Sequence, residues 1–156
     1  MLWSSKVMLT ACIYAWRREH YPKLFDWFKD NYGKSDTRLA INSNLCPKDS
    51  YMNDLIEKSH YVKNFDVYTS AEAIGLRAEY IRDGMDFELW KKNCVRLITE
   101  GSLSALHVMC TVNALCLESL DTLIDWMVSL KEKYGRDYPN FTLNILRFPS
   151  FQSPLV

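Results

Sequence analysis

Four short apolar segments alternate along the chain with longer segments of helical character. The short segments are rich in β-branched and aromatic residues, or alternate apolar with polar positions, which indicates β-strands. They cover residues 38–43, 65–69, 106–112 and 141–148. The longer segments are typical of helices, the clearest of them with apolar residues every three or four positions. They cover residues 23–32, 47–56, 77–83, 87–100 and 117–134.

Strands separated by helices are typical of α/β proteins, in which right-handed crossovers make neighbouring strands parallel. We therefore predict an α/β fold with a mostly parallel sheet whose strands keep the order of the chain. Such a sheet is either open and doubly wound or curved as part of a (β/α) barrel. With four strands, both outer strands would be bare edges, which indicates a piece of a larger sheet. No linker or internal domain boundary interrupts the pattern.

The composition fits one globular domain. Of the 156 residues, 48% are apolar and 24% are charged, and 19 basic residues balance 19 acidic ones to a net charge of zero. This balance offers no basic surface to nucleic acid or to an acidic membrane. The longest apolar stretch near the start, residues 7–16, is too short to span a bilayer. Five widely spaced cysteines favour free thiols over a disulfide framework, so we expect a cytoplasmic protein.

Polar residues follow each predicted strand, where ligands bind to parallel sheets. These segments are Asn42-Ser43-Asn44, Thr69-Ser70-Ala71-Glu72, Thr111-Val112-Asn113 and Arg147-Phe148. The carboxyl ends of parallel strands lie at one edge, so we expect their polar side chains to gather there and to suit a polar, nucleoside-like ligand. The residues concerned are Asn44, Ser70, Glu72 and Asn113. The same residue types also cap helices and form turns, and that role is the commoner one for any single residue.

Other kinds of chemistry have weaker signals. No phosphate-binding glycine loop of the G-x-G-x-x-G or Walker type occurs. His20, His60 and His107 have no partner at the spacing of metal ligands, so we predict no metal site. Cys110 and His107 are unsuited to be a nucleophile pair, because residues three apart on one strand face opposite sides. We therefore expect His107 to be a packed core or surface residue.

Five segments in a fixed order carry a resemblance to a known family. They are Asn42-Ser43-Asn44, Tyr68-Thr69-Ser70-Ala71-Glu72, Ala78-Glu79-Tyr80-Ile81-Arg82-Asp83-Gly84, Thr111-Val112-Asn113-Ala114-Leu115 and the closing run from Leu143 to Gln152. Together they resemble the radical S-adenosylmethionine superfamily, in particular its small members with a twitch-type C-terminal extension. The resemblance divides the chain into an unmatched N-terminal segment, residues 1–21, and a partial barrel of this type, residues 22–156.

The resemblance implies a fold and a chemistry. Proteins of this superfamily have a partial (β/α)₆ barrel, of which this chain would supply about four of the six strands. Three cysteines in a C-x₃-C-x₂-C motif hold a [4Fe–4S] cluster, which reduces bound S-adenosylmethionine to a 5′-deoxyadenosyl radical that abstracts hydrogen from a substrate. This chain has no such motif, so the implied cluster lacks its ligands here. We therefore expect a fragment that begins downstream of the first two strands and is inactive by itself.

The resemblance also implies cofactor contacts for five residues. Asn44 matches the asparagine that commonly ends the third barrel strand, and Asn113 matches the polar residue that closes the fifth. Ser70 and Glu72 match the fourth-strand residues that face the ribose and the amino-acid end of S-adenosylmethionine. Arg82 matches the arginine in the helix behind that strand. The substrate is not implied, and a peptide or a protein is one candidate class.

Three functional interpretations stay open from the sequence. The chain is part of a radical S-adenosylmethionine enzyme, or a non-catalytic binding domain descended from that fold, or an unrelated doubly wound nucleotide-binding domain. The missing cluster ligands leave open whether the chain itself is an enzyme. A flat sheet with a central crevice would favour the third interpretation.

Overall fold

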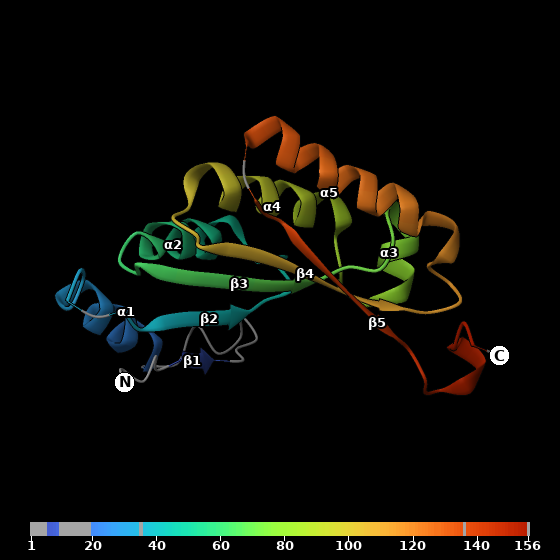
Figure 1. Cartoon of the computed structure of the whole chain (residues 1–156), viewed down its shortest axis with the longest axis horizontal. Coiled ribbons are helices and arrows are strands. Elements are labelled where there is room, and N and C mark those ends of the chain that lie inside the picture. Colours follow the sequence, from blue (N-terminus) through green and yellow to red (C-terminus); the bar gives the residue numbers. More distant parts are fainter. Residues whose placement is uncertain (1–5, 10–19, 35, 136, 156) are drawn as a thin grey trace.

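The computed structural model describes residues 6–9, 20–34, 36–135 and 137–155, and among them it has one parallel β-sheet. The strands lie in the order of the chain, β1-β2-β3-β4-β5, and each neighbouring pair is parallel. They are β1 (Lys6–Leu9), β2 (Arg38–Asn42), β3 (Asn64–Ser70), β4 (Ala105–Val112) and β5 (Asn140–Ile145). Figure 1 shows the strands from β1 at the lower left to β5 in front.

Helices join the strands and cover one face of the sheet. They are α1 (His20–Asp30), α2 (Asp49–Ser59), α3 (Gly75–Ile81), α4 (Phe87–Glu100) and α5 (Leu120–Tyr134), with the short 3₁₀ turns η2 (Leu117–Ser119) and η3 (Ser150–Gln152). Phe25 of α1 meets Phe65 of β3 edge-on, with ring centroids 6.1 Å apart. Trp90 of α4 donates from Nε1 to Oγ1 of Thr69, also in β3, at 2.9 Å, and packs against Trp126 of α5.

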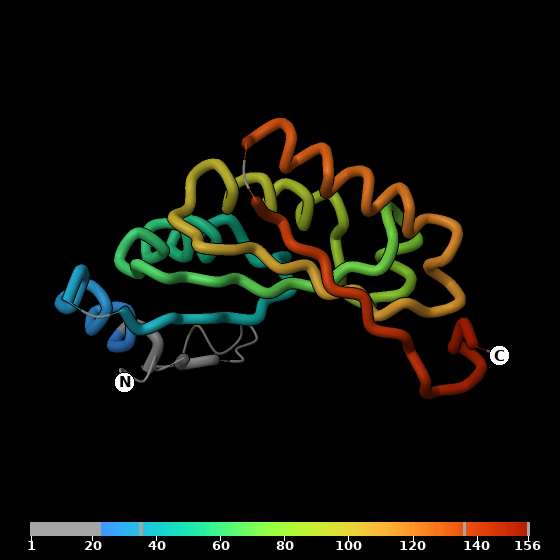
Figure 2. Tube along the Cα trace, in the orientation of Figure 1, coloured from blue at the N-terminus to red at the C-terminus, as the bar shows by residue number. Residues whose placement is uncertain are grey.

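These contacts place the helices on the same side of the sheet. Phe65 and Thr69 are four residues apart in one strand and therefore point to the same face. The helices α1, α4 and α5 lie on that face, and α2 contributes Leu55 to the same core. Figure 2 follows the chain through these successive strand–helix units, with α2, α4 and α5 along one side of the strands.

The predicted α/β class is confirmed, as are the parallel pairing and the strand order. The prediction of four strands is wrong, because β1 pairs with β2 from Lys6 opposite Arg38 to Leu9 opposite Ile41. This strand belongs to the segment 1–21, for which no structure was predicted. The rest of that segment up to residue 19, Cys12 included, lies outside the described residues. The edges β1 and β5 do not pair with each other, so the described sheet is not closed.

The strand order argues against the doubly wound interpretation. A doubly wound sheet has helices on both faces and a reversal of strand order that creates its central crevice. The described strands show no reversal. Chain order with the crossover helices on one face is the winding of a singly wound sheet.

Two predicted boundaries also change. The helix expected from residue 117 begins at Leu120, because its first turn is tightened into η2, as is common where helices start. The strand expected to reach residue 148 ends at Ile145. Its neighbour β4 ends at Val112, whose carbonyl accepts the Leu146 N–H at 2.8 Å, so the ladder has no further partner.

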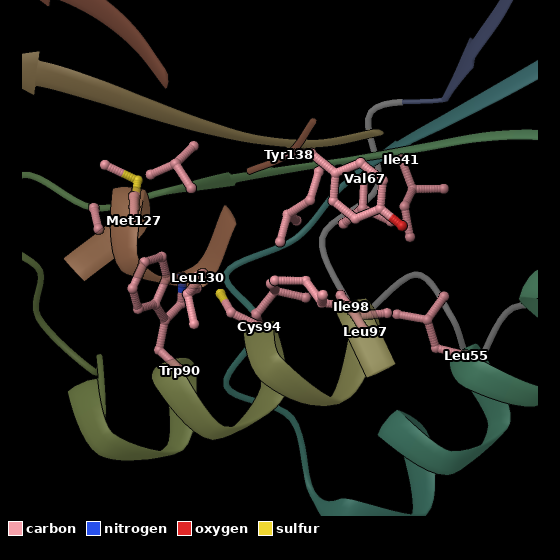
Figure 3. Close-up of a cluster of buried hydrophobic side chains, with 14 of the residues drawn as sticks. Ile41, Leu55, Val67, Trp90, Cys94, Leu97, Ile98, Met127, Leu130 and Tyr138 are labelled. Carbon is pink, nitrogen blue, oxygen red and sulfur yellow. The ribbon is translucent and has the colours of Figure 1, made fainter. Parts of the chain in front are cut away.

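The hydrophobic core lies between the helices and the sheet (Figure 3). In β4, Leu106, Val108 and Cys110 are fully buried, whereas the residues between them are only half-buried. Trp90 and Leu97 of α4 are also fully buried in this core. One face of each central strand is therefore committed to the apolar core, and the alternate positions are left to the opposite face.

The helix-facing side of β5 is less covered than that of β4. Leu143 and Ile145 are 53% and 52% exposed, whereas Val112, directly opposite Ile145 in β4, is 9% exposed. Within the described residues, no strand pairs with the outer edge of β5. This edge therefore combines free backbone hydrogen-bonding groups with exposed apolar side chains.

Replacing Trp90 by alanine is expected to lower the free energy of unfolding by about 3–5 kcal/mol, because a fully buried indole leaves a large cavity. The matched control is Tyr80→Ala, which removes an aromatic side chain that is 80% exposed. That change should alter the free energy of unfolding by less than about 0.5 kcal/mol. Urea unfolding followed by circular dichroism measures both, and equal losses would contradict the packing described here.

Candidate functional site

The carboxyl ends of β2, β3 and β4 lie at one edge of the sheet, because these strands are parallel. Asn44 follows β2, and Asn113 follows β4. Ser70 is the last residue of β3, and Glu72 comes two residues later. The structure thus places these four predicted residues at the same edge, which we call the carboxyl edge. Arg82, which directly follows α3, joins them through a bond to Glu72.

A largely buried ion pair connects Glu72 and Arg82. The Glu72 side chain is 3% exposed and the Arg82 side chain is 37% exposed. Arg82 Nε donates to Glu72 Oε2 at 2.5 Å, and Arg82 Nη2 donates to Oε1. The backbone N–H of Thr111 in β4 also donates to Oε1, at 3.4 Å. The carboxylate thereby links the end of β3 to α3 and β4, and it holds the guanidinium at the carboxyl edge.

The two predicted asparagines serve their own loops. Asn44 Oδ1 accepts the N–H of Cys46 at 3.2 Å. Asn113 Oδ1 accepts the N–H of Leu115 at 3.0 Å, and its Nδ2 donates to the Thr111 carbonyl at 3.1 Å. These are the turn-forming roles that are common for asparagine after a strand. Asn44 and Asn113 therefore shape the carboxyl edge more than they present free groups to a ligand.

Ser70 differs from the asparagines. Its side chain is half-buried, and within the described part of the chain its hydroxyl makes no hydrogen bond. Arg82 likewise uses Nε and Nη2 on Glu72 and leaves Nη1 without a described acceptor. Ser70 and Arg82 are therefore the predicted residues whose polar groups are free to meet a ligand.

Asn93 of α4 supports the carboxyl edge and was missed in the sequence. Leu45 has φ of +50°, a conformation that branched residues rarely adopt. Its N–H donates to Ser43 Oγ at 3.1 Å, and its carbonyl accepts from Asn93 Nδ2 at 2.9 Å. Asn93 is fully buried and lies 48 residues away in sequence. Asn93 of α4 therefore stabilises the loop that carries Asn44, through a contact that no local sequence pattern predicts.

The sheet face opposite the helices carries a second group of polar side chains. By alternation, Asp66 and Tyr68 of β3 lie on this face together with Ser70, and Tyr68 is directly opposite His107 of β4. Arg38 of β2 joins them through Asp66. We call Arg38, Asp66, Tyr68 and His107 the polar cluster. These residues were not predicted, because they lie within the strands and not at their carboxyl ends; the alternation within β3 and β4 is the signal that could have found them.

Asp66 is buried and only partly satisfied. Its side chain is 4% exposed, and its Oδ2 lies 3.2 Å from Nε of Arg38, whose side chain is 43% exposed. Its Oδ1 is buried without a hydrogen-bond donor. A buried carboxylate oxygen that lacks a donor is costly, so this atom stands out among the polar groups of the sheet.

Tyr68 and His107 form a stacked pair beside Asp66. Their ring centroids are 4.3 Å apart and the ring planes differ by 13°. Burial lowers the pKa of His107 from its ordinary value of 6.5, the charge of Asp66 opposes that change, and the charge of Arg38 adds to it. The neutral imidazole is therefore the favoured form near neutral pH.

The described cysteines are free thiols. Cys94, Cys110 and Cys116 are buried and Cys46 is partly exposed, and all four are free. Burial raises the pKa of Cys46 and Cys94, and it raises the pKa of Cys110 to about 12. In the ranges that the structure describes, no group of three or more His, Cys, Asp or Glu side chains could hold a metal ion. As the spacing predicted, Cys110 faces the core while His107 lies on the opposite face.

Comparisons with known proteins give no match from which a function could be inferred. No family model, no curated protein and no solved structure matches the chain. Across the described helices, none has the length and apolar character needed to cross a membrane.

Replacing Arg82 by glutamine should lower the free energy of unfolding by about 2–3 kcal/mol, because Glu72 would stay buried without its cation. This figure is below that of a fully buried pair, because Arg82 is about one-third exposed. Arg77→Gln is the matched control, since Arg77 pairs with Glu118, whose side chain is 79% exposed. The control should cost less than about 1 kcal/mol in the same urea unfolding assay. Equal costs would argue that the Glu72 pair is not buried.

The His107 imidazole should titrate below its ordinary pKa of 6.5, and Asp66→Asn should lower that pKa further, because the Asp66 charge favours the protonated ring. The folded state thus prefers the neutral ring. The corresponding stabilisation is complete above the ordinary pKa and is lost as the pH falls through the lower, folded pKa. NMR titration of the ring signals, assigned with His107→Gln, measures this. Asp137→Asn, at an exposed carboxylate, is the control; a rise in the His107 pKa in Asp66→Asn would overturn the assigned electrostatics.

Proposed function

We propose that the carboxyl edge binds S-adenosylmethionine, and that the chain is the cofactor-binding part of a radical S-adenosylmethionine enzyme. In this proposal the sheet is part of a (β/α) barrel, with the helices outside and the polar cluster inside. The observation that carries the proposal is the gathering of Ser70 and the Glu72–Arg82 pair at the carboxyl edge of a singly wound parallel sheet. Ligands of parallel sheets bind at that edge.

The free groups at the carboxyl edge suit the two polar ends of this cofactor. S-adenosylmethionine carries an adenosine group, with ribose hydroxyls, on one side of its sulfonium and an amino-acid carboxylate on the other. The Ser70 hydroxyl can exchange hydrogen bonds with hydroxyls, and the free Nη1 of Arg82 can donate to a carboxylate. Glu72 then acts as the group that orients Arg82. Asn44 and Asn113 contribute by shaping the loops on either side.

The iron–sulfur cluster does not fit the described cysteines. Cluster ligands are thiolates that converge on one point. Burial raises the pKa of Cys46, Cys94 and Cys110, which disfavours their thiolate forms, and Cys12 lies outside the described residues. No reaction step is therefore assigned to a cluster in this chain. This observation favours a second candidate function, a non-catalytic binding domain with the same fold.

Titration of the purified chain with S-adenosylmethionine in a calorimeter is expected to show saturable, one-to-one binding. Ser70→Ala should weaken the binding about fivefold, the effect of losing one hydrogen bond of about 1 kcal/mol. Ser104→Ala is the control, because Ser104 immediately precedes β4 and lies at the opposite edge of the sheet. The control should leave the dissociation constant unchanged.

Two outcomes would change the proposal. Absence of saturable binding, or equal effects of Ser70→Ala and Ser104→Ala, would contradict a cofactor site at the carboxyl edge. Reconstitution with iron and sulfide under anaerobic conditions separates the two candidate functions. A stoichiometric electron paramagnetic resonance signal after reduction with dithionite would favour an enzyme with an unusual ligand set over a non-catalytic domain.

A further inference from the structure

The polar cluster holds a buried negative charge that the described residues compensate only in part. Asp66 Oδ1 has no donor, and the ion pair with Arg38 involves only Oδ2, which lies 3.2 Å from Nε of Arg38. Arg38 is 43% exposed, so solvent weakens its attraction for the carboxylate. His107 adds no positive charge near neutral pH, because its pKa is lowered. A ligand with N–H donors and a positive charge would supply what Asp66 lacks.

The aromatic pair beside Asp66 points independently to the same kind of ligand. Tyr68 and His107 stand stacked on the sheet, and both are half-buried. Aromatic ring faces attract cations, and a carboxylate next to an aromatic ring is a common means of binding organic ammonium groups. Among the described lysines and arginines, none is placed over the Tyr68 ring, although other rings in the chain have such a partner.

Strand geometry places these groups within reach of one ligand. Asp66 and Tyr68 are two residues apart on one face of β3, which separates them by roughly 7 Å. His107 is directly opposite Tyr68, so it is the diagonal neighbour of Asp66. Ser70 is two residues further along the same face, at the carboxyl edge. Asp66 therefore lies roughly 13 Å from that edge, and the Tyr68–His107 pair lies between the two, roughly 7 Å from the edge.

We propose that Asp66, Tyr68 and His107 form a binding site for an organic cation, a primary ammonium or a guanidinium group on an aliphatic chain. Asp66 accepts the N–H bonds, and Tyr68 contacts the cation with its ring. Arg38 competes with the ligand for the carboxylate, and its half-exposed side chain moves aside when the ligand enters. The cation site stands on its own geometry and does not depend on the proposed function.

The test uses the full chain without S-adenosylmethionine and titrates it with n-butylguanidinium, followed by amide and imidazole NMR signals. The neutral isostere n-butylurea is the matched ligand control and should bind at least about tenfold more weakly, because it lacks the charge. Asp66→Asn should weaken n-butylguanidinium binding about tenfold, whereas Asp137→Asn should leave it unchanged. Arg38→Gln should tighten binding about threefold, because it removes the competing cation.

Asp66→Asn and Arg38→Gln are expected to change the affinity in opposite directions, which a general loss of stability would not do. If Asp66→Asn fails to fold, Arg38→Gln and Tyr68→Leu still decide, since the first must tighten and the second must weaken binding. Equal affinity for n-butylurea would overturn the proposal, as would the absence of nuclear Overhauser contacts between the probe and the Tyr68 ring. Because S-adenosylmethionine is absent, failure here leaves the carboxyl-edge proposal standing. A chain that binds the cation but not S-adenosylmethionine would contradict only the cofactor assignment.

Discussion

The crossover helices return over the same face of the parallel sheet, and this constraint organises the rest of the structure. Parallel strands require long connections, and the apolar stripes of those helices bury one side of each central strand. The hydrogen bond from Trp90 to Thr69 shows how closely α4 sits on β3. With one face committed to packing, residues at alternate positions are free to be polar. The polar cluster lies on the face that this division leaves free, and the carboxyl edge follows from the parallel direction of the same strands.

Most polar groups at the carboxyl edge are hydrogen-bonded within the protein, and few are free to contact a ligand. The side-chain oxygens of Asn44 and Asn113 accept backbone N–H groups of their own loops. Asn93 of α4 donates a hydrogen bond to the loop after β2. Glu72 is saturated by Arg82 and by a backbone N–H. Such bonding fixes the shape of the edge before any ligand arrives. Preorganisation of this kind lowers the entropy that binding costs.

Local sequence patterns predicted the strands that have a clear alternation or a continuous apolar run. The alternation in β4 and the apolar run in β2 carry their own signal, so both strands were found close to their observed bounds. The strand β1 was missed because Lys6–Leu9 is short and merges into a longer apolar stretch without alternation. The likeness of Asn44 and Asn113 to turn residues was also visible, because asparagine after a strand is common in turns. Local patterns do not show which distant residues pair with each other.

The ion pair between Arg38 and Asp66 is the clearest case of such a pairing. It depends on the register that sets β2 against β3, and a shift of one residue would send Asp66 to the core face. The support of Leu45 by Asn93 likewise requires α4 to lie over the loop after β2. Neither contact follows from a characteristic spacing of residues in the sequence. Functional residues that depend on register therefore become visible only in three dimensions.

The uncovered side of β5 has a consequence for how copies of this chain behave in solution. The strand has no charged residue, and its Leu143 and Ile145 are about half exposed. The whole chain has a net charge of zero at pH 7, so little long-range repulsion keeps two molecules apart at that pH. An apolar edge without electrostatic protection favours self-association. The colloidal stability of the isolated chain is therefore lowest near neutral pH, and it improves on either side as the molecule gains charge.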